Sequence, residues 1–218
     1  MSSDSRRFIS HLADRLRSAG RSYPFEWEVP ASVAPYVPTP INIVKKMLEV
    51  GGAGPDDIVY DLGCGDGRIL FTAIEEFNVK KAVGYELNAS MCEAVMRKVK
   101  NKSLEDRIEV INGNFFLADL SSATLITLYL TTSGNTKLKP KFEKELRDGT
   151  RIVSHDFPIN GWMSMRIDEA IHNDIGSHRI YLYRVPDSFK WEEQRGPGES
   201  EGGRWSRIRD AFRGAPRS

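Results

Sequence analysis

Three glycines at alternate positions constrain this chain more than any other feature of its sequence. Gly63, Gly65 and Gly67 lie in the segment VYDLGCGDGRIL, which runs from Val59 to Leu70. A short apolar run precedes them and predicts a strand, and a second apolar pattern follows them and predicts a helix. Glycine adopts backbone angles that other residues avoid, and it lets a ligand touch the main chain. This order of strand, glycine turn and helix is typical of a nucleotide-binding βα unit.

Strand and helix signals continue to alternate after the glycine turn. Short apolar runs predict strands at residues 58–60, 82–85, 108–111, 125–130 and 151–154. Two later segments, 164–171 and 178–185, predict a strand pair joined by a short turn. Repeated βα units predict an α/β fold with a doubly wound, mostly parallel sheet, and the closing pair adds one antiparallel strand.

The starts of three helices are predicted from local signals. Thr39 is a candidate N-cap for a helix that has Pro40 at its first position. Ser90 and Glu93 have the spacing of a capping box for a later helix. A lysine- and glutamate-rich stretch predicts a third helix near residues 137–146.

The glycine spacing indicates which ligand the turn holds. A dinucleotide fingerprint reads G-x-G-x-x-G, whereas this turn reads G-x-G-x-G after Asp61, which suits a ligand with an ammonium group and no phosphates. Glu86, at the end of the second predicted strand, can accept both ribose hydroxyls of an adenosine. After the third strand, Asn114 offers an amide for an adenine edge and Phe115 offers a ring face. Together these groups predict a site for S-adenosylmethionine (SAM).

The acceptor of the methyl group is predicted from the residues after strands four and five. The chain has no Pro-Pro clamp of the kind used for amide nitrogens, and neither of its two cysteines suits attack on cytosine. His155-Asp156 is the one metal-type pair near the site, and we expect no metal there; the pair either lines the site or hydrogen-bonds within its own turn. An apolar, aromatic channel lowers the pKa of a lysine amine from ~10.4 and holds its cation. Tyr36, Phe115, Tyr129 and Trp162 are candidates for such a channel, with ordinary core packing as the alternative for each.

Six segments of the sequence resemble one known family. They read PYVPTP, VYDLGCGDGRI, GYELN, GNFF, TLYLTT and KLKPKFEKELRDGTRIVSHDFP, and together they lie within residues 34–185. The chain resembles the archaeal seven-β-strand protein lysine methyltransferases, which are related to the mitochondrial lysine methyltransferases and more distantly to the telomeric-silencing-type histone lysine methyltransferases. The resemblance implies a seven-stranded class I fold. It also implies that Tyr129 lies near the target lysine. The residues that it implies for SAM contacts are Tyr36, Thr39, Asp61, Gly63, Glu86, Asn114 and Phe115.

One departure from the pattern of the family bears on the substrate. The histone-specific branch has paired asparagines after strand four, where this chain has Tyr129-Leu130. We therefore do not expect histone specificity. Two other classes of function stay open from the sequence: an RNA or small-molecule methyltransferase, and a SAM-binding regulator without catalysis.

Charge is distributed unevenly over three predicted parts of the chain: an N-terminal helix and wrap (1–33), the SAM domain (34–187) and a basic extension (188–218). Residues 1–24 have five arginines and two aspartates, and residues 195–218 have six arginines and three acidic residues, so each end has a net charge of +3. Because the whole chain has a net charge of +1, the body between them has −5. An acidic body suits lysine-rich protein substrates, and basic ends suit nucleic acid. We expect no membrane span and a cytoplasmic location.

Overall fold

The computed structural model describes residues 34–172 and 176–191. The predicted N-terminal helix and wrap (1–33) and residues 192–218 of the predicted basic extension (188–218) lie outside the described residues. The domain boundaries proposed from the sequence stay predictions. No helix of the described ranges combines the length and the apolar character needed to cross a membrane.

Helices and strands alternate along the described chain, as the sequence predicts. In chain order they are α2 (Ile41–Val50), β1 (Ile58–Leu62), α3 (Arg68–Glu75), β2 (Lys81–Glu86), α4 (Ala89–Asn101), β3 (Ile108–Asn112), η1 (Phe115–Leu117), β4 (Leu125–Leu128), α5 (Thr132–Glu145), β5 (Arg151–His155), β6 (Arg166–His172), β7 (Gly176–Arg184) and η2 (Asp187–Trp191).

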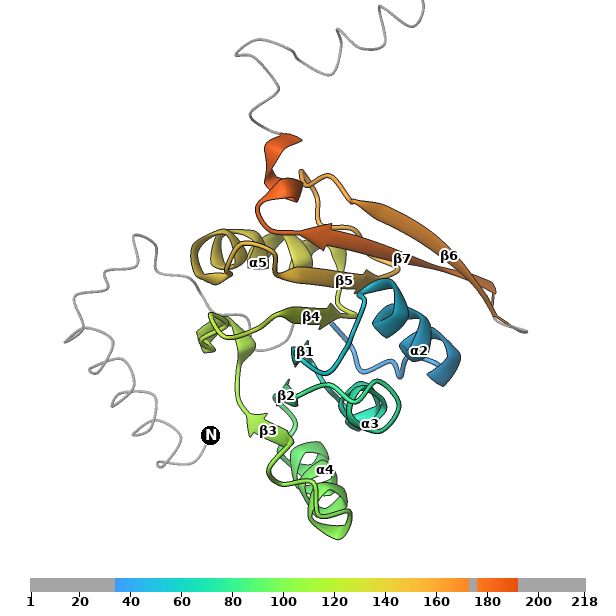
Figure 1. Ribbon diagram of the computed structural model, residues 1–218, viewed down its shortest axis with the longest axis vertical. Helices are drawn as coiled ribbons and strands as arrows, with labels where there is room; N and C mark the ends of the chain where they lie inside the picture. Colours follow the sequence, from blue (N-terminus) through green and yellow to red (C-terminus); the bar gives the residue numbers. More distant parts are fainter. Residues whose placement is uncertain (1–33, 173–175, 192–218) are drawn as a thin grey trace, which may run out of the picture. The chain divides into compact units, whose positions relative to one another are not determined.

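The strands form one seven-stranded sheet in the order β3-β2-β1-β4-β5-β7-β6 (Figure 1). Strands β1 to β5 pair in parallel, and β7 is antiparallel to both of its neighbours. The expectation of a mostly parallel sheet with one antiparallel strand is confirmed. The chain leaves β1 toward β2 and β3 and then crosses back to β4, so the order reverses between β1 and β4. Ligands of open α/β sheets bind at such a switch point, beyond the carboxyl ends of the strands.

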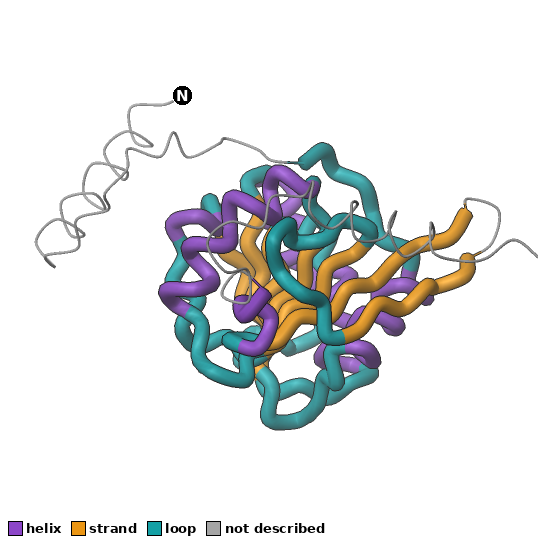
Figure 2. Tube along the Cα trace, turned by 90° about the horizontal axis from the view of Figure 1, so that it is seen from above, coloured by secondary structure: helices purple, strands orange, loops and turns teal. Residues whose placement is uncertain are grey.

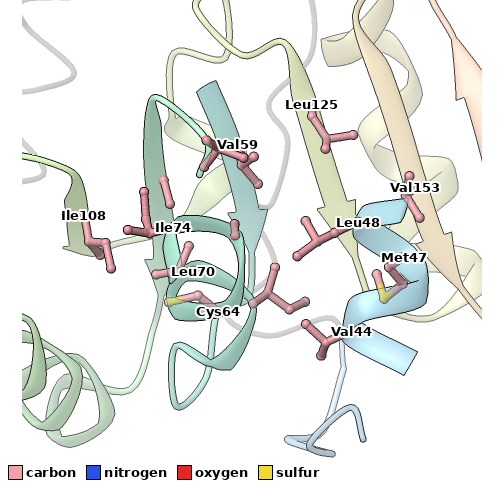
Figure 3. Packing of buried hydrophobic residues seen from close by; sticks show 14 of the residues in the cluster. Val44, Met47, Leu48, Val59, Cys64, Leu70, Ile74, Ile108, Leu125 and Val153 are labelled. Atoms are coloured by element: carbon pink, nitrogen blue, oxygen red, sulfur yellow. The ribbon is translucent and has the colours of Figure 1, made fainter. Parts of the chain in front are cut away.

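Helices cover both faces of the sheet (Figure 2), and each face has its own apolar core. Helices α2, α3 and α4 cover one face, where Val44, Met47 and Leu48 pack toward Leu125 and Val153 (Figure 3). Helix α5 covers the other face with Leu138 and Phe142. Because side chains alternate along a strand, Val59 and Tyr60 of β1 are buried in opposite cores. The apolar runs that predict the central strands reflect this burial on both faces.

Two of the predicted helix caps are wrong. The N-cap of α2 is Pro40 and has no side-chain cap hydrogen bond, whereas the Thr39 hydroxyl lies 3.4 Å from Nδ1 of His155. The N-cap of α4 is Asn88, whose side chain accepts a hydrogen bond from the Met91 N–H, and Ser90 lies inside the helix. Local sequence rules rank serine and asparagine as about equal caps, so the rule alone could not choose between positions two residues apart.

Helix α5 begins five residues before the stretch from which the sequence predicts it. Its N-cap is Thr131, whose hydroxyl accepts from the Gly134 N–H at 3.1 Å. The first turn, Thr132 to Asn135, has no apolar periodicity and includes a glycine, so it gives no helical signal in the sequence. Tertiary contacts of Asn135, described below, hold this turn in place.

The close packing of Gly84 in β2 leads to a test of the fold. A Cβ atom there would lie 2.6 Å from Cys64 Sγ and 2.6 Å from Leu70 Cδ1, both behind the glycine turn. We expect Gly84→Ala to lower the free energy of unfolding by about 1–3 kcal/mol through overpacking, measured by urea denaturation. Gly54→Ala is the matched control, because a Cβ atom there has no neighbour within 4 Å; equal stability of the two variants would contradict this packing.

Candidate active site

The glycine turn lies at the carboxyl end of β1, beside the switch point. Gly63, Gly65 and Gly67 have φ angles of +99°, +53° and +79°, and Gly67 is the N-cap of α3. The turn is tied to the next strand, since the N–H groups of Gly63 and Cys64 both donate to the Tyr85 carbonyl at 2.9 Å. These bonds hold the turn against the end of β2, at the edge of the sheet where the sequence places a ligand.

Glu86 ends β2 and meets the glycine turn directly. Its Oε2 atom accepts from the Gly65 N–H at 3.0 Å, and its Oε1 atom accepts from the Asn88 N–H at 2.8 Å. A carboxylate has about four lone-pair sites, so two bonds to the backbone leave capacity for two hydroxyl donors. These two bonds thus hold the carboxylate in the place where the sequence predicts an acceptor for the ribose hydroxyls.

Asp61, in β1, is a buried acid with only 3% of its surface exposed. The Thr127 hydroxyl donates to its Oδ1 atom at 2.8 Å. Burial is the main cause that raises the pKa of Asp61 to about 7; the Thr127 bond lowers it, and the nearby charges of Glu86 and Asp66 add to the rise. Because Arg68 pairs with Asp66, the charges of Asp61 and Glu86 are the ones that favour a cation beside the turn, as expected for a ligand with an ammonium group.

Arg68 is a structural link at the site that sequence reasoning missed. Its guanidinium binds the carboxylate of Asp66 through Nε at 2.9 Å and Nη2 at 2.6 Å, while Nη1 donates to the Thr39 carbonyl at 2.6 Å. It therefore ties the segment of Tyr36 to Thr39 to the glycine turn. The Tyr36 ring lies on Gly65, where a Cβ atom would approach it to 2.6 Å. This contact explains why Gly65 has no side chain, and it brings Tyr36 and Thr39 to the site as the resemblance implies.

Asn114 and Phe115 follow β3, but the structure gives both of them structural partners. The Asn114 side chain accepts from the Phe116 N–H at 3.0 Å and caps η1. Phe115 is only 6% exposed, and its ring lies 4.9 Å from that of Phe116, centroid to centroid. Both residues lie at the correct end of the sheet, and their contacts with adenine stay predictions.

Tyr129 follows β4 and stacks on groups at the end of β5. Its ring centroid lies 3.9 Å from that of His155 and 6.3 Å from that of Phe157. Burial raises the pKa of Tyr129, and the charge of Asp156 adds to the effect. The phenol is therefore neutral at physiological pH and cannot act as a base there.

A buried polar network that the sequence did not indicate supports Phe157. The Asn135 amide donates to the Phe157 carbonyl at 2.8 Å and to the Ser154 hydroxyl at 3.0 Å, and that hydroxyl donates to the same carbonyl. Asn135 and Ser154 are both fully buried. Only the fold brings them together, because they lie 19 residues apart on α5 and β5.

Trp162 lies in the core, and the two cysteines are unsuited to nucleophilic chemistry. Trp162 packs with Phe142, Tyr183 and Phe189, and its indole N–H donates to Glu143, so the core-packing alternative holds for it. Cys64 and Cys92 are both buried, and burial raises the pKa of each thiol. Protonated thiols are poor nucleophiles, in agreement with the exclusion of cysteine-based chemistry.

The sheet order, the glycine turn and the two acids at the ends of β1 and β2 define a class I SAM-dependent methyltransferase. A family model described as the ANTKMT methyltransferase domain matches residues 61–166. A protein-lysine N-methyltransferase of Saccharolobus islandicus is 48% identical over 151 residues, which cover 69% of this chain and 93% of that protein. The chain belongs to the protein-lysine N-methyltransferases, and it is a SAM-dependent enzyme.

Two further similarities place the chain within this class. The mouse adenine nucleotide translocase lysine N-methyltransferase is 27% identical over 71% of this chain and 64% of its own length. A crystal structure of an RNA methyltransferase from Salinibacter ruber, in complex with S-adenosylhomocysteine, superposes with a TM-score of 0.64 at 33% identity. The superposition covers 76% of this chain and 100% of the Salinibacter chain. The resemblance to archaeal and mitochondrial lysine methyltransferases is therefore confirmed.

Proposed function

We propose that the enzyme holds SAM across the carboxyl ends of β1, β2 and β3 and takes its lysine substrate beside Tyr129. The contact of the Gly65 N–H with the Glu86 carboxylate at 3.0 Å supports this most directly, because it puts the turn and the ribose acceptor in one place. Asp61 faces the ammonium group, and Asn114 and Phe115 bound the adenine. Tyr36 and Thr39, held by Arg68, cover the turn.

The lysine needs to lose a proton before it accepts the methyl group. SAM, when bound, would supply an electrophilic methyl on its sulfonium; transfer to the amine would form an N–C bond, break the S–C bond and leave S-adenosylhomocysteine. Tyr129 and Phe157 form an aromatic wall that desolvates the ammonium and favours its neutral form. Because Tyr129 is itself neutral, its oxygen accepts a hydrogen bond from the amine and orients it, and the proton leaves to solvent. We expect the rate to rise with pH for this reason.

The raised pKa of Asp61 generates a prediction on pH. SAM binding should lower this pKa, because an ammonium favours the carboxylate, so binding releases a proton and the affinity rises as pH rises through about 7. Each unit of pH below 7 should cost up to about tenfold in affinity. Calorimetry between about pH 5.5 and 7.5 measures it, and Asp61→Asn should bind weakly with no such dependence.

Glu86→Ala is the matched control for this experiment. It should lose roughly 1.5–3 kcal/mol of binding free energy yet keep the pH dependence, because Asp61 is intact. The stability of the ligand-free protein depends on pH in the opposite direction. Because the pKa of Asp61 is raised in the folded state, stability is lost as pH rises toward 7. Asp61→Asn should therefore raise the melting temperature at pH 8. Wild-type SAM affinity in both variants would refute the assignment of these acids.

Tyr129 is predicted to serve the acceptor and not SAM. Tyr129→Ala should lower the rate of methyl transfer while leaving the SAM affinity near that of the wild type. Tyr129→Phe keeps the aromatic face and should retain more activity than the alanine variant. Transfer rates on a lysine peptide and calorimetry with SAM measure the two effects. A collapse of SAM binding in Tyr129→Ala would place this residue in the cofactor wall or the core instead.

RNA is a second candidate acceptor, because the Salinibacter protein is described as an RNA methyltransferase and is 33% identical. The lysine acceptor is favoured by the 48% identity to a protein-lysine methyltransferase and by an aromatic wall that suits a cation. Incubation of the enzyme with labelled SAM and either total protein or total RNA separates the two acceptors.

The substrate proteins, in our proposal, are cytoplasmic and associated with nucleic acid. Residues 1–24 and 195–218 each have a net charge of +3, whereas the body has −5. Arginine clusters bind phosphates by releasing counterions, and an acidic body attracts lysines. Basic ends held on nucleic acid would raise the local concentration of proteins bound to it.

Removal of both basic ends should flatten the salt dependence of DNA binding, by about 0.9 in the log–log slope for each phosphate that the ends neutralise. It should also slow methylation of DNA-bound proteins while leaving a free lysine peptide almost unaffected. Binding assays at several salt concentrations and paired methylation assays measure this. Equal loss on free and DNA-bound acceptors, with a lower melting temperature, would show that the ends stabilise the fold instead.

A further inference from the structure

Three side chains with metal-ligating atoms meet at the ends of β5 and β7. Nε2 of His155 lies 2.9 Å from Nδ1 of His178, which lies 2.9 Å from Oδ2 of Asp156, and Nε2 of His155 lies 3.3 Å from that oxygen. His155 is fully buried, and the other two are partly buried. From the sequence we expect no metal at His155-Asp156, but the sequence does not place His178 beside this pair; with this third group in view, we propose that these residues bind one divalent transition-metal ion of the Zn²⁺ type.

The distances between the three atoms fit a metal centre. Bonds of about 2.0–2.1 Å in a tetrahedral zinc site put neighbouring ligand atoms about 3.3–3.4 Å apart. The triangle of 2.9, 2.9 and 3.3 Å reaches this size with outward shifts of a few tenths of an ångström. Two imidazoles and one carboxylate suit Zn²⁺, Co²⁺ or Fe²⁺ better than Mg²⁺ or Ca²⁺, which prefer oxygen ligands.

Hydrogen bonding among the three groups accounts for this arrangement less well. His178 has one hydrogen at most on Nδ1, yet this atom lies 2.9 Å from both other groups. If it donates that hydrogen, the two acceptors that share it are the His155 nitrogen and the Asp156 oxygen, which repel each other at 3.3 Å. If Nε2 of His155 carries the proton of the neutral ring instead, either two N–H groups or two acceptors face each other at 2.9 Å, so each tautomer leaves one of the three short contacts without a hydrogen bond. One divalent cation satisfies all three atoms together.

Two of the ligands are held in place from outside the cluster. Nδ1 of His155 lies 3.4 Å from the Thr39 hydroxyl, and a proton on Nδ1 directs the lone pair of Nε2 inward. Oδ1 of Asp156 accepts from the Arg179 N–H at 2.9 Å, and the Asp156 N–H donates to the Arg179 carbonyl at 2.7 Å. Asp156 adopts a φ of +57°, a rare conformation for an aspartate that these two bonds maintain. Such outer contacts are typical of metal sites.

The metal would also organise the proposed acceptor site. The His155 ring stacks on Tyr129 with their centroids 3.9 Å apart, so an ion that fixes His155 fixes the wall beside the lysine. This consequence rests on the proposed role of Tyr129, whereas the metal site itself does not. Metal binding without any effect of Tyr129→Ala on methyl transfer would leave the metal site standing and refute the acceptor assignment alone.

The test uses the full chain without a polyhistidine tag, stripped of metal by a chelator and then titrated with ZnCl₂ or CoCl₂. We expect one equivalent to bind by calorimetry, visible Co²⁺ absorption bands of a nitrogen- and oxygen-ligated site, and a higher melting temperature with Zn²⁺. Asp156→Asn and His178→Ala should weaken binding by more than the roughly 10–100-fold that loss of an outer partner costs. Asp168→Asn removes a carboxylate from the neighbouring strand β6, where it binds Arg166, and should leave the affinity unchanged.

Each variant is also tested for SAM binding, which shows that it is folded. Stripped wild-type protein that binds no stoichiometric Zn²⁺ or Co²⁺, with no change in melting temperature, would overturn the proposal and leave a hydrogen-bonded triad. Equal losses of affinity in Asp168→Asn and Asp156→Asn would also overturn it, because the ion would then bind elsewhere.

Discussion

The hydrogen bond from the Gly65 N–H to the Glu86 carboxylate joins the two halves of the cofactor site. It requires β1 and β2 to run parallel and in register, with Leu62 opposite Tyr85. The local packing also requires glycine at position 65, because a Cβ atom there would displace the Tyr36 ring. The burial of Gly84 against Cys64 and Leu70 sets the distance between the turn and β2 from behind. The position of the ribose acceptor thus depends on core packing as much as on the carboxylate itself.

The same turn concentrates negative charge at some cost to the stability of the ligand-free protein. Asp61 has a raised pKa because its carboxylate is buried near Glu86 and Asp66. Arg68 offsets one of these charges, since its fork neutralises Asp66 and lowers the pKa of that carboxyl. The remaining charge lies where an ammonium is expected. A site that destabilises the empty protein but stabilises the liganded one gains affinity from the relief of that repulsion.

The sequence was sufficient for the parts of the fold and site that depend on local patterns. Apolar runs located β1 to β5, and the glycine turn, together with Glu86 and Asn114-Phe115 at the next strand ends, indicated SAM. Local rules failed where two neighbouring residues had equal propensity, as at the α4 cap, and where the partner lies far along the chain. Arg68 could have been suspected from its place after the glycine turn. Nothing in the sequence pairs His178 with His155, because that contact depends on the register of β7.

The antiparallel strand β7 is what brings distant groups to the carboxyl edge of the sheet. A parallel strand contributes only the residues at its own carboxyl end to this edge. Because β7 runs the other way, with Ile180 opposite His155, its early residues lie beside the end of β5. His178 and the Arg179 backbone therefore contact Asp156, and His155 connects them to Tyr129 and Thr39. The wall of the proposed acceptor site is thus coupled to the β6–β7 pair. Strands β4 and β5 separate this pair from the glycine turn at the end of β1. A change in the pair can therefore alter the acceptor side without changing the glycine turn.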